Sequence, residues 1–204
     1  MQLIIDKILT LIYPRIIKSF PNAKGKLFFT FDDGPNPSVT PFVLDILKEF
    51  GAKATFFCIG ENVVKNQELY QRILDEGHKT GNHAYTHING FKYSKKEYIE
   101  NVERAHLYIQ SDLYRPPYGK LKPSQYRYLA KFYKIILWDV IAYDFNENLQ
   151  PADCIRNVIN KTKDGSIIVF HDNIKSKDRV LKALPIVLAH LKNSGYIFES
   201  INPD

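Results

Sequence analysis

The sequence predicts an α/β fold: a distorted, incomplete (β/α) barrel with about seven parallel strands. From residue 26 onward, short β-rich apolar runs alternate with amphipathic helical runs, which is the pattern of a parallel sheet covered by helices. The run SIIVF at 166–170 is apolar throughout, as in a strand buried on both faces. A chain of 204 residues suits one domain, so this number of strands favours a small open barrel, with an open doubly wound sheet as the alternative.

The individual elements follow from apolar spacing and from residues that start or stop helices. Ser38 is expected to cap the first helix of the barrel, whose apolar face runs from Val39 to Phe50 and which ends at Gly51. Pro151 suits the first turn of a later helix, and Pro185 is expected to bend the last one. The predicted strands are 27–31, 54–59, an extended piece ending at 82, 113–115, 134–138, 166–170 and 196–200, and the predicted helices are 39–50, 66–76, 95–110, 151–159 and 178–192.

Residues 1–24 are expected to form an apolar, basic segment outside the domain of residues 25–204. Residues 1–26 carry five basic side chains against one acid, which accounts for +4 of the net charge of +6; the nearly neutral remainder argues against nucleic-acid binding. Asp6 and Lys7 interrupt the apolar stretch, so we expect neither a cleavable signal peptide nor a membrane span, and a cytoplasmic or membrane-peripheral location. The helical spacing predicts a short helix over one end of the core; peripheral membrane contact through residues 1–20 is the alternative.

Two predicted strands are followed by groups that suit metal or acid–base chemistry. Asp32 and Asp33 end the first strand in TFDDG, where adjacent carboxylates suit a metal ligand and a general base; an Asp-Gly turn is the structural alternative. His83 and His87 are four residues apart in GNHAYTH. If this segment is helical, both imidazoles lie on one face and can hold one metal ion.

Three further strand ends carry charged or titratable side chains: Arg115 in RPPYG, Asp139 and Asp144 in WDVIAYDF, and His171 in VFHDN. Each of these residues, taken alone, also suits a surface or structural role. The carboxyl ends of parallel strands share one rim of a barrel, where active sites lie. The five motifs together therefore predict a single site.

TFDDG, the HxxxH pair, RPPYG, an aromatic-flanked Asp and VFH occur in this order over residues 25–201, and in this combination the chain resembles the polysaccharide deacetylase family (NodB-homology domain, carbohydrate esterase family four). The resemblance implies a distorted (β/α) barrel and a hydrolase of non-peptide carbon–nitrogen bonds. Such an enzyme removes N-linked acetyl groups from an amino-sugar carbohydrate with a divalent metal, for which we expect zinc, with cobalt or nickel as alternatives. Two other functions stay open: deformylation or deacetylation of a lipid-linked amino sugar, and a catalytically idle carbohydrate-binding relic.

The resemblance also implies a role for each motif. The metal has one carboxylate and two imidazole ligands, while a separate carboxylate and imidazole act as general base and general acid, each oriented by a charged partner. The implied ligands are Asp33, His83 and His87; the base is Asp32, oriented by Arg115; the acid is His171, oriented by Asp144; the Tyr118 backbone N–H stabilises the oxyanion; and Phe145, Val169 and Trp138 bind the substrate.

Four residues depart from the family pattern. Ala84 stands where Ser or Thr is usual, which removes a hydroxyl that could brace the histidine turn. Ile141 replaces a common Asp, Phe145 a common Trp and Val169 a common Leu. None of these changes removes an implied ligand, base or acid; they concern the acyl group and the choice of substrate.

Overall fold

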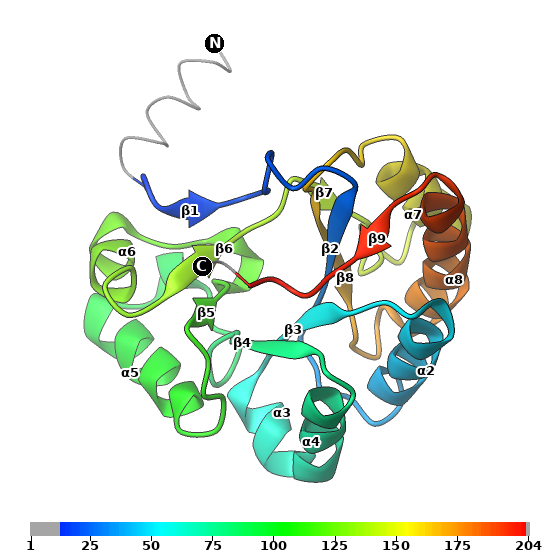
Figure 1. Cartoon of the computed structure of the whole chain (residues 1–204). Helices are drawn as coiled ribbons and strands as arrows, with labels where there is room; N and C mark the ends of the chain where they lie inside the picture. The colour runs from blue at the N-terminus through cyan, green and yellow to red at the C-terminus, as the bar shows by residue number, and fades with distance from the viewer. Residues whose placement is uncertain (1–12, 203–204) are drawn as a thin grey trace.

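A computed structural model describes residues 13–202, in which the strands form one curled, parallel sheet (Figure 1). Its spatial order is β1-β6-β5-β4-β3-β2-β8-β7, and β9 pairs with the start of β2. The strands are β1 (Ile16–Ile17), β2 (Lys26–Asp32), β3 (Ala54–Cys58), β4 (Lys79–Asn82), β5 (Leu113–Tyr114), β6 (Lys134–Ile136), β7 (Val140–Ile141), β8 (Ile167–His171) and β9 (Ile197–Phe198).

The strand order confirms the incomplete barrel. Strands β2 to β6 follow one another around the sheet in chain order, and β8 returns to the free side of β2, as the last strands of a (β/α) barrel do. β1 and β7 end the path without pairing to each other, so the described part of the barrel stays open. The segment after β1 crosses toward β8, where the Phe20 amide donates to the Gly165 carbonyl at 2.8 Å.

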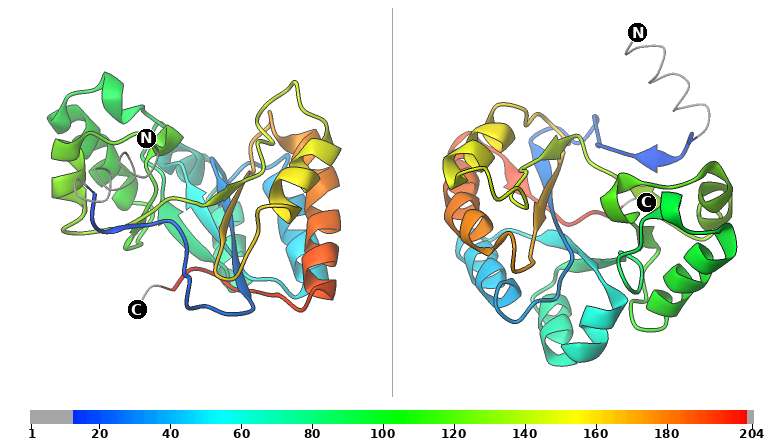
Figure 2. Two further views of the ribbon diagram at one scale, coloured as in Figure 1. Left: turned by 90° about the horizontal axis from the view of Figure 1, so that it is seen from above. Right: turned by 180° about the vertical axis from the view of Figure 1, so that it is seen from behind.

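The helices surround the outside of the sheet (Figures 1 and 2). Their buried faces carry the apolar residues that the sequence pattern indicates, such as Val43, Leu44 and Leu47 of the first helix, which ends at Gly51 with a left-handed φ of 64°. The helices are α2 (Thr40–Phe50), α3 (Gly60–Lys65), α4 (Gln67–Asp75), α5 (Lys95–His106), α6 (Pro123–Leu129), α7 (Pro151–Ile159) and α8 (Lys177–Asn193), with short 3-10 helices η1 (Gly90–Lys92) and η2 (Pro117–Gly119).

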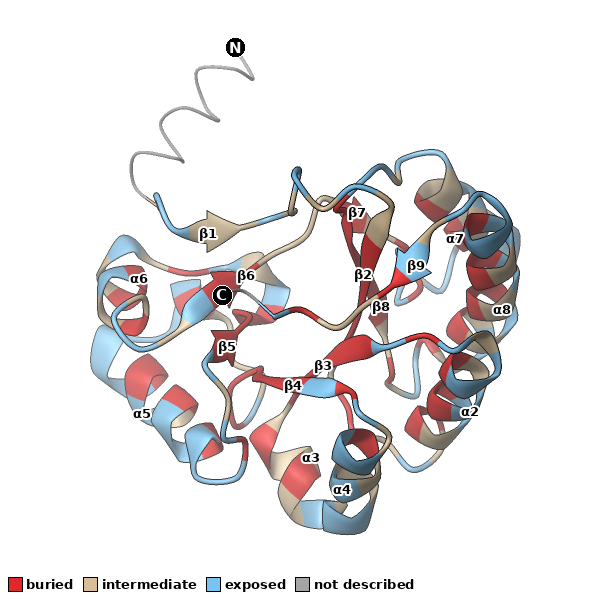
Figure 3. Cartoon of the chain, in the orientation of Figure 1, coloured by how far each residue is buried: buried red, intermediate tan, exposed pale blue. Residues whose placement is uncertain are grey.

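Side chains along β2 alternate between two apolar layers, one outside and one inside the barrel, and the site residue of this strand lies on the inner face. Leu27, Phe29 and Phe31 pack against the surrounding helices, whereas Phe28 belongs to a cluster inside the barrel. Side chains two apart on a strand share a face, so Thr30 and Asp32 point into the barrel with Phe28. Figure 3 shows that the strands are largely buried and that the exposed residues lie mainly on the outer faces of the helices. The interior therefore changes from apolar to polar toward the carboxyl ends of the strands.

Several short elements differ from the sequence prediction. β1, β7, α3 and α6 are not among the predicted elements, because a strand of two residues or a helix of six or seven offers too little apolar spacing to identify. Ser38 does not cap α2: Val39 holds the N-cap position, and the Ser38 amide donates to Asn36 Oδ1 at 2.9 Å. α5 ends at His106 rather than at 110.

The predicted N-terminal helix and membrane contact fall largely on residues 1–12, which lie outside the described residues. Ile16 and Ile17, in the same N-terminal segment, form β1 beside β6. Among residues 13–202, no helix has both the length and the apolar character needed to cross a bilayer.

Candidate active site

Asp32 and Arg115 form a buried ion pair inside the barrel. Asp32 ends β2, Arg115 follows β5, and the guanidinium Nη1 donates to Asp32 Oδ1 at 2.6 Å and to Thr30 Oγ1 at 2.7 Å. The other nitrogens of Arg115 donate to the carbonyls of Ile136 and Leu137 at 3.3 and 3.0 Å. Burial lowers the pKa of Arg115, and the neighbouring Asp32 carboxylate partly offsets this effect. A wholly buried cation with this many partners holds one oxygen of Asp32 in a fixed direction.

His83 and His87 come together on a loop, so the helical geometry that would place both imidazoles on one face is not what brings them together. Asn82 ends β4, and the chain then turns with left-handed φ values of 65° at Ala84 and 52° at His87. The two imidazole centroids are nevertheless only 5.0 Å apart. The proximity comes from this loop conformation and not from the four-residue period of a helix.

Two asparagines brace this loop where the sequence lacks a hydroxyl. The buried Asn82 accepts the Ala84 amide at 2.8 Å through Oδ1. Asn101 on α5 accepts the amides of Tyr85 and Thr86 at 2.8 and 3.2 Å. Ala84 itself is fully buried, so this position contributes apolar packing.

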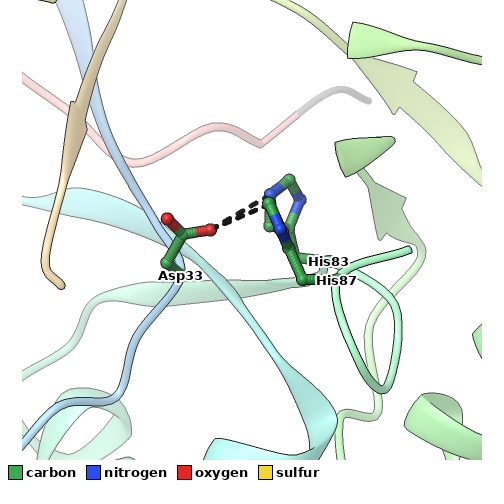
Figure 4. Close-up of side chains that lie close together, drawn as sticks. All are labelled: Asp33, His83 and His87. Atoms are coloured by element: carbon green, nitrogen blue, oxygen red, sulfur yellow. Dashed lines mark ion pairs between the residues drawn. The ribbon is translucent and has the colours of Figure 1, made fainter. Parts of the chain in front are cut away.

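Asp33 faces both histidines (Figure 4). Asp33 Oδ1 lies 3.1 Å from His87 Nε2 and 3.6 Å from His83 Nε2, and these three ligand atoms lie within 4.8 Å of one another. Among the described residues, Asp33 Oδ1 is a buried oxygen without a hydrogen-bond partner.

The tautomer of His83 explains why this arrangement suits a cation. Its Nδ1 lies 2.7 Å from the Arg115 carbonyl, which can only accept, so Nδ1 carries the proton and Nε2 presents a lone pair. Burial, followed by the neighbouring His87, lowers the pKa of His83 to about 3, which keeps the ring neutral. A lone pair and a carboxylate oxygen therefore face each other, and one carboxylate with two imidazoles is a donor set that suits zinc and related divalent metals.

His171 and Asp144 form a second polar pair beside Asp32. His171 is the register partner of Asp32 on the adjacent strand, although 139 positions separate them in the chain. The fully buried Asp144 accepts from His171 Nδ1 at 2.8 Å and from the His171 amide at 2.7 Å. Burial alone lowers the pKa of His171, but the Asp144 carboxylate outweighs it, and the pKa rises to about 9. His171 is thus protonated at neutral pH, next to Asp32.

The residues implied to bind substrate lie around these groups. Tyr118 is 59% exposed, has a left-handed φ of 60° and packs its ring 4.6 Å from that of His87; its amide has no acceptor in the described part of the chain. Phe145 packs edge-on against His171 at 5.1 Å. Val169 is buried on the same face of β8 as His171, and Trp138 is partly buried beneath the Arg115 guanidinium, 5.6 Å from it.

Asp139 does not lie at this site, which corrects one expectation. The predicted strand 134–138 corresponds to β6, which ends at Ile136, and Asp139 directly precedes a separate strand, β7. Its carboxylate accepts from the Ile167 amide at 2.9 Å and from Ser166 Oγ at 3.0 Å, at the start of β8 and at the opposite end of that strand from His171. Asp139 is therefore held at the amino-terminal end of β8, at the opposite end of the strand from the site.

The sequence analysis missed two residues that directly follow His171. Asp172 is fully buried and accepts from the Gly34 amide at 2.9 Å and from Thr40 Oγ1 at 2.6 Å; burial raises its pKa to about 7. Asn173 donates to Asp33 Oδ2 at 2.6 Å. Their position directly after a strand that ends at the rim was the signal that could have identified them. Nothing in the local sequence indicates that they contact the loop after β2.

Comparison with known proteins adds independent information. A family model described as polysaccharide deacetylase matches residues 21–135. A peptidoglycan-N-acetylglucosamine deacetylase of Bacillus cereus is 30% identical over 190 residues, covering 89% of each chain, and a peptidoglycan-N-acetylmuramic acid deacetylase, PdaC of Bacillus subtilis, is 33% identical over 80% of this chain and 36% of its own length. The crystal structure of the Bc1960 peptidoglycan N-acetylglucosamine deacetylase superposes with a TM-score of 0.88 at 29% identity, covering 95% of this chain and 93% of that one.

Proposed function

The chain belongs to the polysaccharide deacetylase family, and from this premise we propose that it removes N-linked acetyl groups from an amino-sugar carbohydrate by metal-dependent hydrolysis. The observation that carries the proposal is the convergence of Asp33, His83 and His87, with Asp32 and His171 side by side on adjacent strands next to them. One region of the barrel thus holds a donor set for a cation, a carboxylate and a protonated imidazole.

Asp33, His83 and His87 would hold the metal. A divalent cation bound there supplies a Lewis acid that lowers the pKa of water and polarises the acyl oxygen. The donor set fits this role because the Asp33 oxygen is buried without a hydrogen-bond partner among the described residues and His83 Nε2 carries no proton.

Asp32 is the general base that accepts the proton of the attacking water. Its Oδ1 is occupied by the Arg115 guanidinium, so Oδ2, which lies 3.9 Å from His83 Nε2, is the oxygen directed toward the proposed ligands. Arg115 fixes the direction of this carboxylate, because the guanidinium is itself held by Thr30 and by backbone carbonyls.

His171 is the general acid that donates a proton to the leaving amine. Its Nδ1 is bonded to Asp144, which leaves the Nε2 proton for transfer. The Asp144 carboxylate outweighs the effect of burial and raises the pKa of His171 to about 9, so the acid form is present at neutral pH. Base and acid therefore occupy neighbouring positions in opposite protonation states.

The Tyr118 amide donates to the developing oxyanion, and Phe145, Val169 and Trp138 provide the apolar wall for the acetyl methyl group. The left-handed φ at Tyr118 and its unengaged amide support the first role. The edge-on contact of Phe145 with His171 and the burial of Val169 support the second.

The favoured substrate is a peptidoglycan-type glycan, because relatives from two Bacillus species carry this activity in their names on different amino sugars. Acetate release should be measured from peptidoglycan, chitin oligomers and a lipid-linked amino sugar, with the zinc-loaded protein and after exhaustive chelation. We expect release from at least one glycan and its loss on chelation. Release that persists without metal would contradict metal dependence, turnover of the lipid-linked sugar alone would favour that substrate, and no release from any substrate would favour a binding relic.

A further inference from the structure

We infer that Asn173 is a positioning residue that fixes the orientation of the Asp33 carboxylate, so that one of its oxygens faces the two histidines. The inference rests on the proposed metal-dependent function, because it concerns a proposed metal ligand. Asn173 lies two residues beyond the end of β8, and its Nδ2 donates to Asp33 Oδ2 at 2.6 Å. This contact joins two segments that are 140 positions apart in the chain.

The orientation of the Asn173 amide is determined by its second partner. Asn173 Oδ1 accepts the Ser176 backbone amide at 3.0 Å. A backbone N–H can only donate, so the oxygen of the side-chain amide must face Ser176 and its NH2 group must face Asp33. The donor that Asp33 Oδ2 meets is therefore fixed by the turn that begins α8.

The other atoms of Asp33 are held as well. Its backbone has a left-handed φ of 83°, its amide donates to the Phe57 carbonyl at 3.2 Å, and its carbonyl accepts from Asn62 Nδ2 at 2.7 Å. Rotation of the carboxylate is the freedom that remains, and the Asn173 bond removes it. Oδ1 is then the oxygen directed at His83 and His87.

The loop that carries Asp33 is itself fixed to the same segment. Asp172 accepts the Gly34 amide and the Thr40 hydroxyl, and its own amide donates to the Asp32 carbonyl at 3.0 Å. A Cβ atom at Gly34 would lie 2.0 Å from Asp172 Oδ2, so the two loops are in close contact. Asn173 and Asp33 therefore lie on two segments that are hydrogen-bonded to each other beside this contact.

The test is zinc affinity, measured by competition with a chromophoric chelator, for the full chain and the variants Asn173→Ser and Asn173→Ala. A serine hydroxyl can still accept the Ser176 amide but does not reach Asp33, whereas alanine removes both contacts. We expect both variants to bind zinc about 10- to 100-fold more weakly, as for other residues that orient metal ligands, with a changed absorption spectrum of the cobalt-substituted protein. Ile174→Ala, at an exposed neighbouring side chain, is the control and should bind as the unmodified chain does.

The outcomes separate this inference from the proposed function. Zinc binding by Asn173→Ser within twofold of the unmodified chain, with the same cobalt spectrum, would overturn the positioning role even if Asn173→Ala fails to fold. An effect of Asn173→Ala alone would assign the residue to the turn with Ser176, and would also overturn it. If the unmodified chain binds neither zinc nor cobalt, the proposed metal-dependent function fails first.

Discussion

At the level of single residues, four polar side chains of the site each use one atom for a fixed partner and direct another atom inward. The four partners are a guanidinium, a side-chain amide, a backbone carbonyl and a buried carboxylate. This arrangement sets both the direction and the protonation state of the reacting atoms. The four pairs are Asp32 with Arg115, Asp33 with Asn173, His83 with the Arg115 carbonyl, and His171 with Asp144.

The first prediction separates the base from the metal ligands. Asp32→Asn should leave zinc bound, because Asp33, His83 and His87 persist, while kcat falls by about 10²-fold or more, the range typical of acid–base catalysis. Metal content and kcat should be measured on the same preparation. Normal turnover by Asp32→Asn would show that another group accepts the proton.

This substitution also needs a stability control, because Arg115 is wholly buried. Removing one partner of a buried ion pair typically costs about 3–5 kcal/mol, and the asparagine oxygen recovers part of this by accepting from Arg115. Urea unfolding of Asp32→Asn should therefore show a folded protein of reduced stability at the temperature of the assay.

The second prediction concerns pH. The pKa of His171 rises to about 9 in the folded protein, above its ordinary value of 6.5, so the acid form is present below 9 and is lost as pH rises through that value. We expect kcat to fall on the alkaline side near pH 9. The stability that the proton contributes is likewise complete below the unfolded pKa of about 6.5 and lost as pH rises through 9.

Asp144→Asn is the matched variant for this pH profile. Without the Asp144 carboxylate, burial lowers the pKa of His171 against only the weaker effects of Asp32 and Asp33, so the alkaline limb of kcat should move to lower pH. An unchanged limb near pH 9 in Asp144→Asn would assign that ionisation to another group.

At the scale of elements, the site depends on the register between β2 and β8. Asp32 pairs with His171 and Thr30 with Val169, so a parallel ladder places the proposed base and the proposed acid side by side. The opposite end of β8 is fixed by Asp139 and by the segment that follows β1, through the Phe20 amide and the Gly165 carbonyl. The carboxyl end of β8 thus carries the proposed acid, and its amino end carries the contact with the segment that follows β1.

The third prediction tests the contact between Phe20 and Gly165 at the amino end of β8. Gly165 has a φ of 72°, and a Cβ there would lie 1.8 Å from the Phe20 carbonyl oxygen, so Gly165→Ala must displace backbone. We expect a loss of about 2–4 kcal/mol in the free energy of unfolding, from the left-handed conformation and the overlap together. Gly195→Ala, with a φ of 88° and no atom within 4 Å, is the control and should cost only about 1 kcal/mol. Equal losses in urea unfolding would show that the overlap relaxes without cost.

At the scale of the whole molecule, the curled sheet brings the ends of β2, β4, β5 and β8 to one rim. One apolar layer lies between the sheet and the helices, and the other lies inside the barrel toward the amino ends of the strands, away from the proposed ligands. The fold therefore has a core that does not depend on a metal, and the ligands converge on a preformed barrel.

The fourth prediction follows from this separation of core and site. Chelated protein should remain folded, and free zinc at 100 times its dissociation constant should add about 2.7 kcal/mol to the free energy of unfolding. His87→Ala should lose most of this increment while keeping the stability of the chelated chain. Unfolding on chelation at 25 °C would show instead that the metal is part of the core.

Much of the fold and the general location of the site follow from local sequence patterns. The long strands β2, β3 and β8, the helices α2 and α7, and the family are all recognisable, because apolar spacing and turn residues act over a few positions. The two-residue strands β1 and β7 are too short for such a pattern. Missing β7 placed Asp139 at the rim, whereas it lies at the start of β8.

Local sequence patterns establish the barrel class, the family and the order of the motifs at the strand ends. They do not establish that the two histidines meet through a left-handed loop, that His83 keeps its Nε2 free of a proton, or that Asn173 lies against Asp33. The physical reason is range: helices and strands are specified by neighbours in the chain. Tautomers and ligand directions are set by partners up to 140 positions away, which only the register of the curled sheet brings into contact.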